Sequence, residues 1–409
     1  MTLPVGASLK LFPSIVSFVI VSAASAQSPL TLEQAIATAR ANRPAFQAAR
    51  LRVNEAMHAR SALGAYPASR LFVGYTSNPE VGGMDDDLVL AVPIDVFGRT
   101  AAGRNSGNAL VARAEAEFRS VAADVQSEVV TAYLDASASL ALVSSAKSVQ
   151  EALQNLYDAT RLRVEGGAVA GIQLTRVGLE LDQAKLRTEQ RQTELAANIR
   201  RLEAVLGPDA KASLAGAFPA IPVVAVDAKS IVAQRADLLI LAAEIRAAEA
   251  DARSARLGGL PDLEIQGRRT PWQETDRRYG LRVQLSIPLG DFGRVRSESR
   301  AASTRAEAAR KALADATNIA LGEISAAQIE VDAARNQVSR YEALVATARQ
   351  IVERLRPALT EQATTLIEVI DATRTLREVE EGLIEARQRL AEAQARHIKA
   401  TGQILEVSK

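Results

Sequence analysis

The clearest alternation of apolar and polar residues lies between residues 281 and 287. Its apolar positions are Leu281, Val283, Leu285 and Ile287, and its polar positions are Arg282, Gln284 and Ser286. Three further segments alternate in the same way, with apolar positions at Leu71, Val73 and Tyr75, at Leu88, Leu90, Val92 and Ile94, and at Leu263 and Ile265. A period of two residues predicts β-strands with one apolar face. We expect two strand pairs, at residues 70–95 and 262–289.

Helical patterns rich in alanine fill most of the remaining chain. The predicted helices span residues 31–63, 98–165, 171–206, 227–257, 293–361 and 366–402. The first opens with Thr31-Leu32-Glu33-Gln34, the sequence of a capping box. Each of the two longest helices would extend about 100 Å at ~1.5 Å per residue. Such lengths predict thin helical packing and no large globular core.

The chain repeats itself at a fixed offset. Residues 92–99 (Val-Pro-Ile-Asp-Val-Phe-Gly-Arg) and 287–294 (Ile-Pro-Leu-Gly-Asp-Phe-Gly-Arg) share their proline and their Phe-Gly-Arg, 195 residues apart. In each copy a strand reaches a proline, which cannot donate to a sheet ladder, and a glycine then leads into a long helix. The junction residues are Pro93, Phe97, Gly98, Pro288, Phe292 and Gly293.

This offset predicts an internal duplication. We place one repeat at residues 27–207, a connector at 208–227 and the second repeat at 228–409. Within each repeat the two short helices together match the long one in length. We therefore expect them to stack end to end beside it, with the strand pair inserted midway along one side.

The amino terminus has the features of a secretory signal peptide, residues 1–26. Lys10 precedes an apolar run, and Ala24-Ser25-Ala26 matches the small-residue pattern at which cleavage occurs, here after Ala26. No later stretch reaches the ~20 apolar residues of a membrane helix, so the strands are the candidate membrane segments. The 409 residues include no cysteine, which excludes a lipid-bearing cysteine and thiolate metal sites.

Four strands with one apolar face cannot close a barrel, and open sheet edges are not tolerated in hydrocarbon. Copies of the chain must supply the missing strands. Two copies would give eight strands, whose interior side chains fill the barrel, whereas three would give twelve and leave a lumen. The smallest conducting assembly is therefore a homotrimer in contact with outer membrane lipid.

The duplicated strand pairs and long hairpins, the Phe-Gly-Arg junctions, the Asn78-Pro79-Glu80 loop and the Glu368-to-Ala372 segment resemble the TolC-like outer membrane efflux protein family, and most closely its CzcC-type heavy-metal branch. The resemblance implies a mainly α fold with a small β part. In it, helical hairpins form an α-barrel below a trimeric twelve-stranded β-barrel. It also implies a Gram-negative outer membrane location, a periplasmic adaptor (membrane fusion protein) and an inner-membrane pump, for which the RND type is one candidate.

Two carboxylates begin the last predicted helix. Glu368 and Asp371 match family positions at the periplasmic aperture, and threefold symmetry would place six acids around one constriction, which favours cations. The alternative is a purely structural role, because Thr365 to Glu368 also reads as a capping box. Gln173 takes the corresponding place in the first repeat, where the family commonly has an acid.

The two hairpin tips are where the resemblance places adaptor docking. The candidate residues are Gly166, Gly167, Gly171, Thr364 and Thr365, within tips that include the segment from Gln362 to Leu366. The glycines also suit ordinary turns. Trp272 and Tyr279 are candidates for an interfacial aromatic belt or for plain loop residues.

The sequence shows no catalytic, cofactor or metal motif. His58 and His397 lie too far apart in the sequence to suggest a metal site, so in heavy-metal export the pump would select the metal ion. The net charge of +1 gives no electrostatic attraction to nucleic acid. We expect a passive channel subunit of a tripartite efflux system and not an enzyme. The alternatives are a periplasmic coiled-coil adaptor or scaffold, and the outer membrane channel of a type I protein secretion system.

Overall fold

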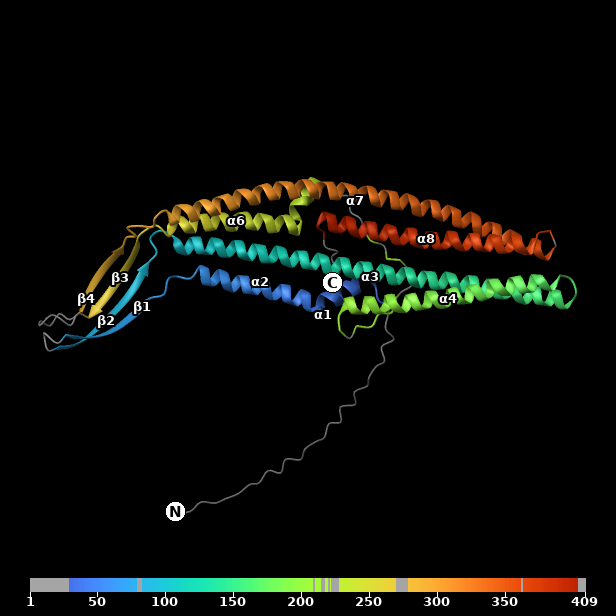
Figure 1. The fold of residues 1–409 in the computed structure, drawn as a ribbon, viewed down its shortest axis with the longest axis horizontal. Helices are drawn as coiled ribbons and strands as arrows, with labels where there is room; N and C mark the ends of the chain where they lie inside the picture. Colours follow the sequence, from blue (N-terminus) through green and yellow to red (C-terminus); the bar gives the residue numbers. More distant parts are fainter. Residues whose placement is uncertain are drawn as a thin grey trace, which may run out of the picture.

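The computed structural model describes residues 29–78, 83–208, 210–214, 218–219, 221, 228–269, 279–361 and 363–403. In the first repeat the elements are α1 (Leu32–Asn42), α2 (Pro44–Leu63), β1 (Arg70–Asn78), β2 (Gly83–Ile94), α3 (Arg99–Glu165) and α4 (Gly171–Leu206). In the second they are α5 (Ala228–Ile231), η1 (Val232–Gln234), α6 (Ala236–Leu257), β3 (Asp262–Arg269), β4 (Tyr279–Ser286), α7 (Arg294–Thr360) and α8 (Leu366–Thr401). Helices dominate, and the four strands form one small sheet (Figure 1).

The internal duplication is confirmed. Helices α3 and α7 each have 67 residues, α4 and α8 each have 36, and all four pairs of equivalent boundaries differ by 195 residues. Gly98 and Gly293 introduce the long helices with φ of +76° and +85°. Glycine tolerates this left-handed conformation, which turns the chain from strand to helix.

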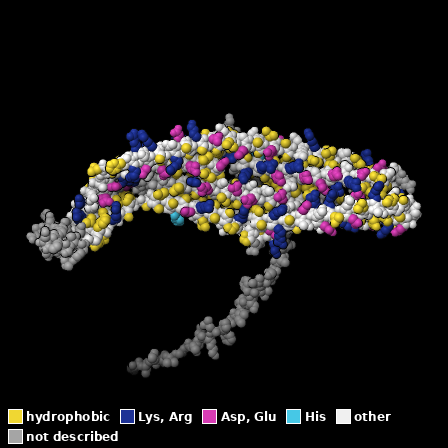
Figure 2. Space-filling model, viewed as in Figure 1, with side chains coloured by type: hydrophobic (Ala, Val, Ile, Leu, Met, Phe, Trp, Pro, Cys, Tyr) yellow, Lys and Arg dark blue, Asp and Glu magenta, His cyan; other side chains and the backbone are white. Residues whose placement is uncertain are grey.

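The helices form one layer, four wide at each level. Near the sheet the neighbours are α2, α3, α6 and α7, and toward the hairpin tips they are α4, α3, α8 and α7 (Figure 1). The short helices therefore stack end to end beside the long ones, as the lengths predicted. Figure 2 shows acidic, basic and apolar side chains interspersed along this helical body.

The sheet is not where we expected it. Both strand pairs lie beyond one end of the long helices, and they are not inserted midway along a side (Figure 1). The reason is that each strand pair connects the end of a short helix to the beginning of a long one, so it extends the layer lengthwise.

Two predicted helices are broken. The expected helix 31–63 ends at Asn42 and restarts at Pro44, and Arg43 between them is extended, with ψ of 124°. Proline lacks the N–H that a continuous helix needs, and it disfavours a helical residue before it. The expected helix 227–257 is also broken, at Arg235, which is extended with ψ of 137° although no proline follows it.

The largest apolar cluster joins α1, α3 and the end of α4 at mid-length. Its fully buried members include Ile36, Val129, Leu134, Leu202 and Leu206. The hydroxyl of Tyr133 donates to the carbonyl of Leu30 at 2.9 Å and fixes the segment that precedes α1.

By length and composition, α3 contains one 18-residue window that could cross a membrane, with mean hydropathy 1.4. Our expectation that no later stretch reaches this apolarity is wrong for this window. However, 56% of the window is buried inside the protein, as in the core helix of a soluble body. Its apolarity therefore matches packing against the neighbouring helices.

Candidate functional site

The four strands form an antiparallel sheet in the order β1-β2-β3-β4. Its register places apolar residues opposite one another on a single face, as the pairs Leu71–Leu90, Val92–Ile265, Leu263–Leu285 and Ile265–Val283 show. These side chains are turned outward: Val73, Leu281 and Val283 are 76%, 77% and 64% exposed. One continuous apolar surface thus faces away from the protein.

The opposite face of the sheet is mixed in polarity and better covered, with Val89 and Ala91 buried beside polar side chains. Gln266 is 9% exposed and donates to the side-chain oxygen of Gln284 at 2.9 Å. Arg70 forms an ion pair of 3.2 Å with Glu264 across the sheet. A sheet that exposes a row of large apolar side chains and covers hydrogen-bonded polar ones is inverted relative to a soluble protein, and it is suited to lipid on the outside and water on the inside.

Both edges of the sheet are open. Among the described strands, β1 pairs only with β2 and β4 pairs only with β3. Exposed strand edges carry unpaired N–H and C=O groups, which readily pair with another chain.

The strand-to-helix junctions are built alike. Pro93 pairs with Glu264 near the end of β2, and Pro288 follows β4. Asp95 and Asp291 accept backbone N–H groups at the starts of α3 and α7. Phe292 has φ of +48° and is fully exposed, whereas Phe97 is 41% exposed. The second junction is therefore left uncovered.

At the tip of the second repeat, Glu368 acts as a helix cap. Its carboxylate accepts from the Thr364 hydroxyl and from the Thr365 N–H at 3.0 Å, and its own N–H donates to the Thr365 hydroxyl at 3.3 Å. These hydrogen bonds, that of Thr364 first, hold the pKa of Glu368 below its ordinary value. Its side chain remains exposed beside this cap.

One turn further along α8, Asp371 lies 3.6 Å from Arg374, which also forms an ion pair with Glu180 of α4. This contact, which joins the two hairpins, was not predicted from the sequence. Nearby, the buried side chains of Val177, Leu366 and Ile370 pack together. The structure thus places Asp371 in a small charged network beside this apolar cluster.

The tip of the first repeat is simpler. Gly167 has φ of +72°, which requires glycine, while a side chain at Gly171 would meet nothing within 4 Å. The amino terminus of α4 has no side-chain cap, and Gln173 is half-buried. The structure therefore places the predicted residues of the two tips on two separate loops with different local chemistry.

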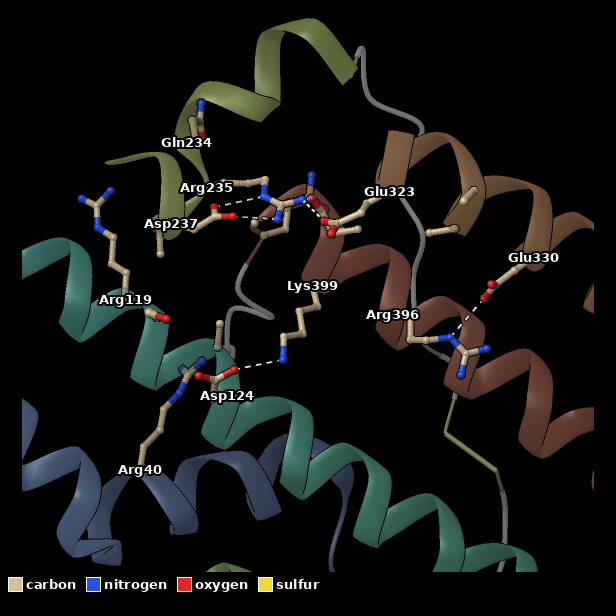
Figure 3. A pocket seen from close by; sticks show the side chains of 18 residues that line it. Arg40, Arg119, Asp124, Gln234, Arg235, Asp237, Glu323, Glu330, Arg396 and Lys399 are labelled. Atoms are coloured by element: carbon tan, nitrogen blue, oxygen red, sulfur yellow. Dashed lines mark hydrogen bonds and ion pairs between the residues drawn. The ribbon is translucent and has the colours of Figure 1, made fainter. Parts of the chain in front are cut away.

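An open crevice of about 1180 Å³ lies at mid-length between α3, α6, α7 and α8. Figure 3 shows Arg235 between Asp237 and Glu323, with Lys399 facing Asp124. In the part of the chain that the structure describes, no group of three or more metal-binding side chains comes together.

Several sequence expectations lie outside the described residues. These are the signal peptide at residues 1–26, the centre of the loop after Asn78, Trp272 and Gln362. Tyr279 is the first residue of β4 and is 79% exposed.

Sequence reasoning also missed the role of Arg99. Its guanidinium donates to the carbonyls of Leu257 and Leu260 and forms an ion pair with Asp262. The signal was present, because arginine closes the repeated Phe-Gly-Arg junction, but the partners lie about 160 residues away.

Similar folds occur among solved structures. CusC matches with 19% identity and a TM-score of 0.74, over 91% of this chain and 92% of that one. The CmeC outer membrane channel of Campylobacter jejuni (16%, TM-score 0.71, 91% and 85%) and the open MtrE outer membrane channel of Neisseria gonorrhoeae (16%, 0.71, 91% and 89%) also match. No curated protein matches significantly.

The expected fold class, long duplicated helical hairpins with a small four-stranded sheet, is confirmed by these likenesses. The family model described as outer membrane efflux protein matches residues 35–208 and 228–403, most of the described chain. Members of that family are transport proteins and not enzymes. The chain belongs to the outer membrane efflux protein family.

Proposed function

We propose that three copies of this chain form a closed conduit that passively conducts exported substrates across the periplasm and the outer membrane. The observation that carries the proposal is the inverted sheet. An exposed row of apolar side chains such as Leu281 and Val283, with Gln266 and Gln284 hydrogen-bonded behind it, suits a wall between lipid and water.

The two open strand edges support closure by self-association. Because four strands alternate in direction, β4 of one copy meets β1 of the next in antiparallel orientation, and three copies give twelve strands. Eight strands from two copies would leave an interior filled by side chains. A trimer is the smallest ring with a lumen.

The helical layer has open edges on the same two sides. On α4, the exposed residues Ile172, Leu179 and Leu186 follow a seven-residue spacing. On α7, Leu344 and Ile351 are exposed at the same spacing. Apolar residues seven apart form the seam of a left-handed coiled coil. We infer that α4 and the α7 of a neighbouring copy pack along this seam and close the periplasmic tunnel.

The test uses the full-length protein purified in detergent. We expect a trimer by native mass spectrometry and discrete conductance steps in planar bilayers. Val283→Arg on the lipid side should cost about 2–4 kcal/mol and lower the yield of folded trimer. Gln284→Arg on the opposite face is the matched control and should fold. A water-soluble monomer, or equal tolerance of both arginines, would refute the conduit.

We further propose that the hairpin tips dock a periplasmic adaptor (membrane fusion protein), which links the channel to an inner-membrane pump. Photo-crosslinking residues placed at Gly166 and Thr364 should capture the adaptor in whole cells. The same residue at exposed Leu51, on α2 far from the tips, is the control. Equal capture at all three positions would count against docking at the tips.

We assign an aperture role to Glu368 and Asp371, which threefold symmetry would repeat as a ring of six carboxylates. Glu368→Gln with Asp371→Asn should reduce cation preference in single-channel recordings. Gln173→Glu, at the equivalent position of the first repeat, should increase it. An unchanged preference in both variants would leave Glu368 with the capping role alone.

Cargo choice belongs, in this proposal, to the pump. A deletion strain screened against metal ions, drugs and a secreted polypeptide separates the heavy-metal, drug and type I secretion versions of the proposal, because each predicts sensitivity or secretion loss for one class only.

A further inference from the structure

Arg99 fastens the first repeat to the second. It begins α3, and its Nε and Nη2 donate to the carbonyls of Leu257 and Leu260 at 3.2 Å and 2.6 Å, while Nη1 forms an ion pair with Asp262. These acceptors end α6 and lead into β3. One side chain thus ties the base of the β1–β2 pair to the base of the β3–β4 pair.

The equivalent of Arg99 is Arg294, the first residue of α7, 195 residues later. Among the described residues, the partners of the Arg294 side chain are local: an ion pair of 3.1 Å with Glu298 and the nearby charge of Asp291, and the side chain is 66% exposed. It therefore has the position of Arg99 without the corresponding partner turn.

The equivalent of the turn between α6 and β3 is the turn between α2 and β1, residues 64–69. The two turns align through Leu63 with Leu257 and through Pro67 with Pro261, both at an offset of 194. Residues 65–69 are exposed, and Tyr66 is 55% exposed. Arg104 of the same chain donates to the carbonyl of Gly64 at 3.4 Å, at the start of this turn. Among the described residues, no arginine of the same chain reaches the carbonyl of Tyr66, as Arg99 reaches that of Leu260.

Arg294 and the turn at residues 64–69 lie on opposite edges of the layer. Arg294 lies at the base of edge strand β4, and the turn at residues 64–69 lies at the base of edge strand β1. In a closed ring, first and second repeats alternate around the circle. The Arg99 contact joins the first repeat to the second within one chain, so an equivalent contact should join the second repeat of one chain to the first repeat of the next.

We propose that Arg294 of one copy binds the turn at residues 64–69 of the next copy and fastens the ring between subunits. The inference rests on the proposed trimer and names a contact that holds it. Leu63, the equivalent of Leu257, has its carbonyl packed against Gly103, where a Cβ would lie 2.0 Å away. The carbonyl of Tyr66, the equivalent of Leu260, is therefore the main acceptor.

The contact between subunits differs from the one within the chain at one position. Asp262, which pairs with Arg99, is replaced in the first repeat by Ala68. The guanidinium of Arg294 thus finds carbonyl groups but no carboxylate. Charge-assisted hydrogen bonds to a carboxylate are stronger than those to a neutral acceptor, so Ala68→Asp should strengthen the ring.

The experiment measures dissociation of the purified full-length trimer in detergent. Arg294→Ala should raise the protein concentration at which half of the trimer dissociates, by at least about tenfold. The reason is that hydrogen bonds to charged groups contribute about 1.5–3 kcal/mol. Arg296→Ala, at an exposed arginine in the same turn of α7, is the matched control and should leave dissociation unchanged. Ala68→Asp should lower dissociation, and this gain should vanish when Arg294→Ala is combined with it.

Crosslinking gives an independent measurement, because the chain has no cysteine. Ala68→Cys with Arg294→Cys, treated with a short bismaleimide, should give covalent dimers and trimers, while each single variant stays monomeric on denaturing gels. A stable wild-type trimer with Arg294→Ala equally stable, or crosslinks only within one chain, overturns this contact and leaves the conduit intact. A monomeric wild type overturns both.

Discussion

The two repeats differ at their mid-length joints, where the end of α4 or α8 meets the short helix that begins the repeat, α1 or α5. In the first, Leu202 and Leu206 at the end of α4 are buried against Ile36 and Val129. In the second, the end of α8 borders the charged crevice, and the short α5 has 4 residues where α1 has 11. The backbone plan is shared, but the second joint combines a smaller apolar cluster, which includes Val232, Leu238 and Ile324, with the charged crevice.

Equivalent positions show where the two joints diverged. At an offset of 195, His397 replaces Leu202 and Thr401 replaces Leu206, yet all four side chains are buried. The hydroxyl of Thr401 donates to the carbonyl of His397 at 3.0 Å. The second joint thus adds hydrogen bonds and ion pairs to a smaller apolar cluster. Such polar contacts contribute less net stability than apolar burial of the same volume.

The largest expected difference comes from truncating the equivalent side chains. Leu202→Ala should destabilise the protein by about 2–5 kcal/mol, because a fully buried leucine leaves a cavity. His397→Ala should cost less, about 1–2 kcal/mol, because burial of the polar imidazole stabilises less than burial of a leucine side chain. Thermal unfolding followed by circular dichroism measures both. Equal losses would show that the two joints are equally sensitive to a cavity at these positions.

The arginines at the two helix breaks give a smaller contrast. Arg235 contacts Asp237 at 2.8 Å, Glu323 at 2.7 Å and the carbonyl of Ala400 at 3.2 Å, and its side chain is 13% exposed. Arg43 contacts Glu128 at 2.6 Å.

Arg235→Ala should therefore cost about 1–2 kcal/mol, because two half-exposed carboxylates and a carbonyl lose their partner. Arg43→Ala should cost less than about 1 kcal/mol. The same unfolding measurement compares them, and a larger loss for Arg43→Ala would reverse the assignment of the polar joint to the second repeat.

Local patterns were enough to predict most of the fold. Alternation gave the strands, helical periodicity gave the hairpins, and Gly98 and Gly293 marked both junctions, because each of these signals lies within a few residues of the feature it specifies. The capping box at Thr365 was predicted and is present. It accounts for the position of Glu368 at the start of α8.

Features that depend on distant residues were not predictable. No proline marks the break at Arg235, whose partner Glu323 lies 88 residues away. The sheet was misplaced because helix lengths alone fit a strand pair at the end of the layer as well as one midway along it. The pairing of Arg374 with Glu180 joins residues 194 apart, and no local pattern reports such a contact.

The smallest predicted effect is a pH dependence that only the second joint should show. Burial lowers the pKa of His397 below its ordinary value of 6.5, and Asp332 opposes this only in part. The folded state therefore binds fewer protons than the unfolded state between pH 6.5 and the lowered pKa. The stabilisation should be fully present above pH 6.5 and decrease as pH drops through this window. His397→Leu restores the chemistry of Leu202 and should abolish the slope. His58→Leu, at the other histidine, which is exposed on α2, should retain it. If both variants keep the slope, His397 is not its source, and the two joints differ in packing alone.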